Sequence, residues 1–206
     1  IPLAIVALCD HAVSAETVAP YQGLSPMRRD VRSLVCDINR RFLRVVLENP
    51  QETDTATRER TLRDRQCLRS LAMLLRPDEE LVAAFWGLSQ KQASKVARGL
   101  DDTYSFAFDG STPYTLHPLV RSCLREDLLT EKQRTTDWHA LHDGLYRLMP
   151  VLQKRFTSLE RKFRQGDERY LHTEWREALL DLLNVFLWLG AEEEARRLLV
   201  NHWVGA

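Results

Sequence analysis

The stretch that decides the fold, residues 89–121, reads SQKQASKVARGLDDTYSFAFDGSTPYTLHPLVR. Ser89 is followed three residues later by Gln92, which is a capping-box pattern and predicts a helix running to about residue 100. The period then changes to two, because aromatic residues alternate with smaller ones on both sides of Asp109-Gly110. This alternation predicts a short β-hairpin that turns at these two residues.

Helical patterns flank the predicted hairpin on both sides. Before it, apolar residues at three- and four-residue steps predict a helix over 62–75, and Pro77 opens a short helix over 77–85 that Gly87 ends. After the hairpin, Pro118 begins another helix, with leucines on its inward side. Three helices, a hairpin and a closing helix are the order of a winged-helix domain, so the aromatic face of the hairpin is expected to pack on the helices.

The rest of the chain is predicted to be helical, which makes the expected fold class mainly α. The predicted division is a helical subdomain (1–58, ending in a polar linker from Gln51 to Arg58), the winged-helix domain (59–130) and a C-terminal helical, repeat-like arm (131–206). Gly166 and Gly190 are expected to end helices within the arm. The further predicted helices are 2–20, 27–48, 137–165, 168–189 and 191–203.

The composition is that of an ordinary globular chain. It has 206 residues, 44% hydrophobic and 28% charged, with 29 basic and 29 acidic side chains. Zero net charge gives no overall attraction to nucleic acid or to an anionic membrane. Four widely spaced cysteines favour reduced thiols in a cytosolic protein, and no stretch is long and apolar enough to suggest a membrane span. The apolar start at Ile1 is expected to be a cut inside a longer protein.

The motifs of common enzymes are missing from the sequence. It contains no phosphate loop of the GxxxxGK[ST] type, no GxSxG elbow and no HExxH pair, so no catalytic residue is expected in this segment. His139 and His142 lie one helical turn apart near two aspartates, but a zinc site needs further ligands at compatible positions. We therefore expect no metal site. The tryptophans of the arm, Trp138, Trp175, Trp188 and Trp203, are expected to pack in its core.

His117 is the residue best placed for chemistry. It stands between the end of the predicted hairpin and the first turn of the helix that begins at Pro118, where backbone N–H groups and the helix dipole favour an anion. Imidazole can donate a hydrogen bond to a phosphate oxygen. The alternative is that His117 only caps this helix or closes the hairpin against the core, and the spacing alone favours that alternative.

Residues 114–121, YTLHPLVR, resemble the winged-helix signature of STAND-class (NB-ARC-like) signalling ATPases, in which a hairpin strand ends in a hydrophobic-His-polar motif. Leu116, His117 and Pro118 take the positions of its Met-His-Asp form, with proline in place of the acid. The opening Ile-Pro-Leu-Ala, which contains Pro2, resembles the end of the family's Gly-x-Pro-Leu-Ala motif. The resemblance covers roughly residues 1–130.

This resemblance implies a regulatory segment of a protein that is switched by ADP and ATP. His117 would contact the β-phosphate of ADP in the closed state, and Pro2 would lie against the adenine. The nucleotide would be bound by a domain before Ile1, so the parent protein would be an NTPase while this segment alone would hold no cofactor. The implied partners are that upstream domain, downstream sensor repeats and other protomers on activation, in the cytoplasm and without membrane or nucleic acid.

Two other functions are compatible with the same pattern. A winged helix can bind DNA through its third helix, and Lys91, Lys95 and Arg98 form one basic stripe there. Three phosphate contacts support only weak, salt-sensitive binding, and a solvated or partner-facing surface explains the stripe equally well. The third possibility is a purely structural helical scaffold, which a histidine at position 117 buried against carbon atoms would favour.

Overall fold

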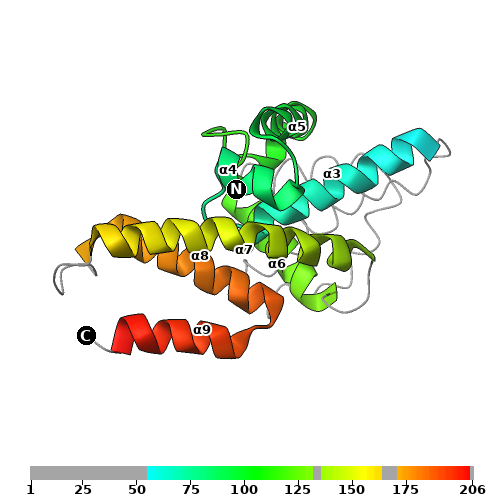
Figure 1. The fold of residues 1–206 in the computed structure, drawn as a ribbon. Coiled ribbons are helices and arrows are strands. Elements are labelled where there is room, and N and C mark those ends of the chain that lie inside the picture. The colour runs from blue at the N-terminus through cyan, green and yellow to red at the C-terminus, as the bar shows by residue number, and fades with distance from the viewer. Residues whose placement is uncertain (1–54, 132–135, 164–170, 205–206) are drawn as a thin grey trace, which may run out of the picture.

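The structure is a computed structural model that describes residues 55–131, 136–163 and 171–204 (Figure 1). The described part is mainly helical, which confirms the predicted class. The predicted helices 2–20 and 27–48, together with Pro2, lie outside the described residues. The elements are α3 (Thr55–Met73), α4 (Glu79–Trp86), α5 (Gln90–Thr103), the 3-10 turn η2 (Ser105–Ala107), α6 (Pro118–Glu131), α7 (Thr136–Lys162), α8 (Thr173–Leu189), α9 (Glu192–Leu199) and the π-helical turn η4 (Val200–Val204).

Several predicted helix boundaries were wrong; among them, α8 begins at Thr173, after its extended N-cap His172, rather than at residue 168. α3 begins at Thr55 rather than near residue 62, so residues 55–58 are helical and do not belong to a linker. Its first turns are polar and mostly exposed, and apolar periodicity therefore gives no sign of them. Pro77 precedes α4 instead of opening it, because Asp78 is the N-cap and its side chain accepts a 2.9 Å hydrogen bond from the Leu81 amide.

The local signals around α5 and α8 were read correctly. The capping box of Ser89 and Gln92 is formed at the start of α5, and Gly87 ends α4 in the left-handed conformation with φ 66°. Gly190 ends α8 in the same way, with φ 71°. Gly166, by contrast, lies outside the described residues.

The predicted hairpin was largely wrong. In the described residues its pairing is a single antiparallel bridge between Phe108 and Leu116, flanked by hydrogen bonds from the Asp109 amide to the Thr115 carbonyl (3.1 Å) and from the His117 amide to the Ala107 carbonyl (2.8 Å). Before the bridge the chain forms the 3-10 turn η2 instead of a strand. The amides of Ala107 and Phe108 bond back to Tyr104 and Ser105, so these donors are used within the turn. The aromatic packing was correct, since Tyr104 and Phe108 are buried.

One apolar core runs through the described helices without a break, from Leu68 in α3 to Ala195 in α9. α7 is the central element, since it contacts α4 on one side and α8 on the other (Figure 1). Trp175 and Trp188 of α8 are buried in this core, and Trp138 is half-buried beside them, as predicted for the arm. The side chain of Trp203 is outside the described set. In the residues that the structure describes, no helix combines the length and apolarity needed to cross a bilayer.

α7 lies very close to α4 at Gly144. A Cβ atom at this position would lie 2.4 Å from Cε1 of the Phe85 ring and 3.0 Å from the Phe85 carbonyl oxygen. Phe85 is itself buried, with 2% of its surface exposed, so its ring has little room to move. Glycine at position 144 therefore sets the distance between the two helices.

We expect Gly144→Ala to destabilise the fold by about 1–3 kcal/mol, because overpacking outweighs the gain of up to ~1 kcal/mol in helix propensity. Gly99→Ala in α5 is the matched control, since nothing lies within 4 Å of a Cβ added there. This control should raise the free energy of unfolding slightly. Urea denaturation measures both changes, and equal stabilisation by the two alanines would contradict the close contact.

Candidate functional site

His117 is the residue that immediately precedes α6. Its carbonyl oxygen accepts the first bond of the helix, from the Arg121 amide at 3.0 Å, which makes His117 the N-cap. Its Nδ1 accepts a bond from the Leu119 amide at 3.3 Å. The side chain therefore has the capping role that was one of the two alternatives.

The same bond fixes the chemistry of the ring. A neutral imidazole whose Nδ1 is an acceptor carries its proton on Nε2, so Nε2 is the donor. The residue is partly exposed rather than buried against carbon. His117 thus combines a capping bond on one ring nitrogen with a hydrogen-bond donor on the other.

A carboxylate lies close enough to this histidine to interact with it electrostatically. The pKa of Asp109 is held below its usual value chiefly by the hydroxyl of Ser111 (2.6 Å), then by the Ser111 amide (2.8 Å), and to a smaller extent by His117. Asp109 is therefore ionised at neutral pH. A phosphate that reaches Nε2 of His117 has to do so beside this negative charge, which weakens any binding at this point.

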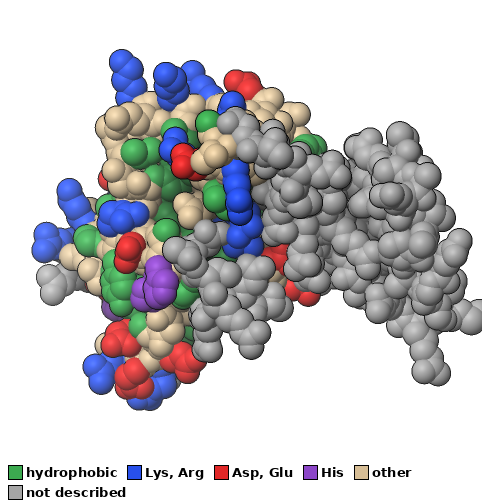
Figure 2. All heavy atoms as spheres, turned by 90° about the vertical axis from the view of Figure 1, so that its right-hand side faces the viewer, with side chains coloured by type: hydrophobic (Ala, Val, Ile, Leu, Met, Phe, Trp, Pro, Cys, Tyr) green, Lys and Arg blue, Asp and Glu red, His purple; other side chains and the backbone are tan. Residues whose placement is uncertain are grey.

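The basic stripe lies on the exposed side of α5. Lys91, Lys95 and Arg98 line a hollow of about 770 Å³ together with Gln90 and Ser94, and Glu79 and Asp102 contribute acidic groups to the same hollow. The opposite side of α5 is buried through Ala93, Ala97 and Leu100. Figure 2 shows basic side chains projecting from the end of the molecule at which α5 lies in Figure 1. His117 is not among the described residues of this lining.

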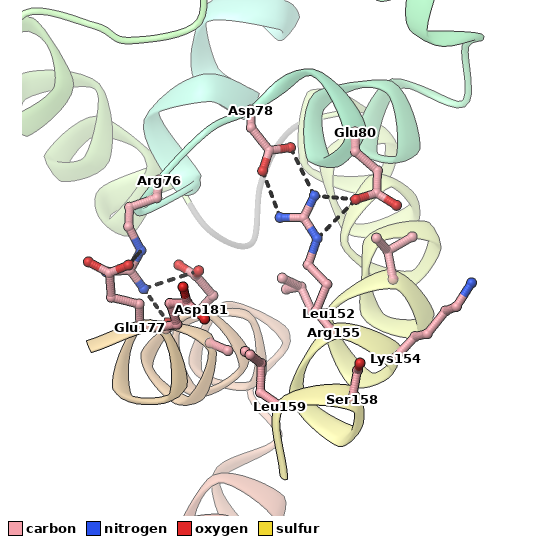
Figure 3. Close-up of a pocket in the computed structure, with 13 residues that line it drawn as sticks. Arg76, Asp78, Glu80, Leu152, Lys154, Arg155, Ser158, Leu159, Glu177 and Asp181 are labelled. Atoms are coloured by element: carbon pink, nitrogen blue, oxygen red, sulfur yellow. Dashed lines mark hydrogen bonds and ion pairs between the residues drawn. The ribbon is translucent and has the colours of Figure 1, made fainter. Parts of the chain in front are cut away.

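A cleft that was not predicted from the sequence opens between the start of α4, α7 and α8 (Figure 3). Its volume is about 500 Å³, and side chains such as Val151, Leu152 and Leu159 make its walls partly apolar. Charged groups from all three helices surround it. Figure 3 shows Arg155 lying between Asp78 and Glu80, and Arg76 turned toward Glu177 and Asp181.

Two arginines connect the helices around this ion-pair cleft. Arg155 of α7 donates to both oxygens of Asp78, at 2.6 and 3.2 Å, and also to Glu80. Arg76, just after α3, forms a 3.1 Å ion pair with Asp181 and donates to the backbone carbonyl of Glu177 in α8. The charges of the cleft are thus largely engaged with one another.

The electrostatics of the cleft follow from its partial burial. Burial lowers the pKa of Arg155, but the hydrogen bonds to Asp78 and Glu80 outweigh this effect, so the net pKa is raised and the charge is secure. Burial raises the pKa of Asp181, and the nearby Arg76 offsets only part of that increase. These ion pairs connect the helices around the cleft.

No motif identified this cleft, because its members are far apart in the sequence. Asp78 and Glu80 read as acids that favour a helix start, which is also a role they have. Arg155 lies more than seventy residues later, on a long helix with a polar face, and no recognisable motif surrounds it in the sequence. Only the packing of α7 on α4 brings it to Asp78.

The histidine pair of α7 takes part in aromatic contacts. His142 lies 6.2 Å from the Trp138 ring and 5.0 Å from the Tyr146 ring, between centroids, and His139 is exposed. Across the described ranges, no three His, Cys, Asp or Glu side chains are grouped so that they could hold a metal ion. Within the described residues, neither Cys67 nor Cys123 forms a disulfide.

Comparison with known proteins gives no family for this chain: no family model, curated protein or solved structure matches it.

The two roles of Asp78, capping α4 and pairing with Arg155, can be separated by substitution. Asp78→Asn keeps a good N-cap but removes the charge and one of the two oxygens that accept from Arg155, so the free energy of unfolding should fall by about 0.2–1 kcal/mol, and less at high ionic strength. Asp78→Ala also removes the cap and should cost about 1 kcal/mol more.

Chemical denaturation at low and high salt measures these effects. Glu79→Gln is the control, since it removes a charge from the same helical turn but outside the Arg155 bonds. An equal loss of stability in the asparagine and alanine variants would contradict the capping role.

Proposed function

We propose that this chain is a regulatory segment of a signalling protein switched by ADP and ATP, of the STAND type. Its role in that protein is to close over bound ADP and to relay signals through protein contacts. The observation that carries the proposal is the arrangement at His117, a partly exposed N-cap whose Nδ1 is occupied and whose Nε2 is therefore the donor. A donor at a helix start, where the helix dipole also favours an anion, suits a terminal phosphate of ADP.

The order of the elements supports the same proposal. α4 and α5 form a helix-turn-helix pair, the bridge between Phe108 and Leu116 follows, and α6 begins directly after His117. The arm formed by α7, α8 and α9 packs on this unit. Leu180 and Leu187, seven residues apart on α8, remain 45% and 58% exposed, which suits contacts with a further domain or protomer.

The ion-pair cleft gives such a segment a means of relaying a signal. Arg155 and Arg76 connect the start of α4 and the end of α3 to α7 and α8 by polar bonds that are partly solvent-exposed. Bonds of this kind can be exchanged for other polar partners at little cost, unlike an apolar core. A displacement of the helix-turn-helix pair in the switch would therefore alter the arm through these residues.

The nucleotide role of His117 is tested by a pair of variants in the full-length protein. His117→Ala removes both the cap and the Nε2 donor, whereas His117→Ser restores a good cap without that donor. Both should weaken ADP binding roughly tenfold to a hundredfold, the value of a hydrogen bond to a charged group, and only the alanine should destabilise α6. Calorimetric ADP titration and thermal unfolding measure the two effects.

Normal ADP affinity in the serine variant would leave capping as the only role of His117. The proposal of a nucleotide switch would then be rejected in favour of a structural scaffold.

A DNA-binding function is the second candidate, because Lys91, Lys95 and Arg98 are gathered at one exposed hollow on the second helix of a helix-turn-helix pair. The negative charges of Glu79 and Asp102 in the same hollow repel DNA phosphates and so weaken such binding. This function predicts duplex binding whose affinity falls with salt at a slope near that of about three phosphate contacts.

Substitution of all three cations by glutamate should abolish this binding in a gel-shift assay. Arg161→Glu, at an exposed position of α7, should leave the binding unchanged. Absence of retardation of the unsubstituted chain at low salt would exclude the DNA-binding function.

A further inference from the structure

A second hollow, separate from the ion-pair cleft, lies where α3, the turn between α4 and α5, and α7 meet. Its volume is about 260 Å³. The apolar part of the lining includes Trp86 at the end of α4, Leu88 in the following turn, Val96 of α5 and Leu141 of α7. A ligand bound there would contact the helix-turn-helix pair and the arm at once.

The polar atoms in the floor of this hollow are already bonded within the fold. The Trp86 indole Nε1 donates to the Ser70 hydroxyl at 2.6 Å, and that hydroxyl donates to the Cys67 carbonyl at 2.6 Å. Burial, and next to it the Asp64 carboxylate, raise the pKa of the Cys67 thiol to about 12, so the thiol is neutral at physiological pH. The lining at Cys67 therefore offers carbon and sulfur surface, and Asp64 acts on it from outside the lining.

Two arginines line the hollow, Arg63 from α3 and Arg147 from α7, and none of the described lining residues is acidic. Arg147 is held in place, because it donates to the Phe85 carbonyl at 2.9 Å and lies against Gly87, where a Cβ would be 3.2 Å from its Nε. That bond uses one of the five N–H groups of its guanidinium. Arg63 is exposed.

We propose that this hollow binds a small amphipathic carboxylate. The apolar tail occupies the space between Trp86 and Leu141, and the carboxylate is met by Arg63 and Arg147, since guanidinium groups pair with carboxylates through parallel hydrogen bonds. The volume is below the ~300–1,000 Å³ of drug-sized pockets, so the tail is a short acyl chain or a single ring. Such a site is independent of the proposed nucleotide switch.

Charge and shape together select this class of ligand. An inorganic anion would leave the apolar lining in contact with water, and a neutral apolar ligand would give neither arginine an anion to pair with. A helix of a partner protein is about 10 Å across and does not enter a hollow of this size. A bound carboxylate would stabilise the folded chain by mass action, and in particular the contact between α4 and α7.

The test uses the full chain and sodium octanoate as the probe, with n-octanol as the matched neutral ligand. Calorimetric titration should give an octanoate dissociation constant of about millimolar, as expected for a ligand of this size, and n-octanol should bind at least roughly tenfold more weakly. Arg63→Gln should reduce octanoate affinity by roughly tenfold and leave n-octanol binding unchanged. Arg63 is chosen because Arg147 also caps α4.

Two further variants complete the experiment. Ala140→Phe places a ring into the hollow from an exposed position of α7 and should remove binding of both ligands, with the fold retained. Arg58→Gln, which removes an exposed charge of α3 outside the hollow, should bind octanoate normally. The proposal is overturned if octanoate does not bind, or if n-octanol binds equally well. It is also overturned if inorganic phosphate displaces octanoate, or if the Ala140→Phe variant still binds octanoate.

Discussion

The fold depends on the way α7 holds α4. Three residues of α7 act on that short helix. Gly144 leaves room for Phe85 of α4 to contact the backbone of α7. Arg147 binds a carbonyl at the C-terminal end of α4, and Arg155 binds the acids at its start. An eight-residue helix has too few internal bonds to be stable alone. Its direction, and with it the direction of α5, is therefore set by α7, a helix that begins fifty residues further along the chain.

The features proposed here to have a function follow from this contact. The ion-pair cleft is bordered by the start of α4, the carboxylate-binding hollow by its end, and the basic stripe lies on α5, which packs against it. The position of His117 depends instead on local bonds, namely the cap of α6 and the adjacent bridge between Phe108 and Leu116. A change in the α4–α7 contact would therefore affect the cleft, the hollow and the stripe together, whereas the position of His117 relies on short-range bonds.

The hairpin shows where local pattern and local chemistry disagreed. Alternation of aromatic residues predicted two strands, but the Tyr104 carbonyl accepts the Ala107 amide, which a longer ladder would need. The loop after Asp109 is held by the side chains of Asp109 and Thr112. The burial of Tyr104 and Phe108 was predictable, because it requires only that apolar rings face the helices. The number of paired residues was not predictable, since it depends on competition between nearly equal hydrogen bonds.

The sequence alone determined the features that rest on bonds between near neighbours. These are the capping box at Ser89, the glycine ends at Gly87 and Gly190, the start of α6 at Pro118 and the helical class of the chain. The tertiary structure alone decided the Arg155–Asp78 pair, the Gly144–Phe85 contact and the union of Arg63 with Arg147 at one hollow. These groups are separated by tens of residues, and only burial of the shared core brings them together, because no local bond encodes that distance.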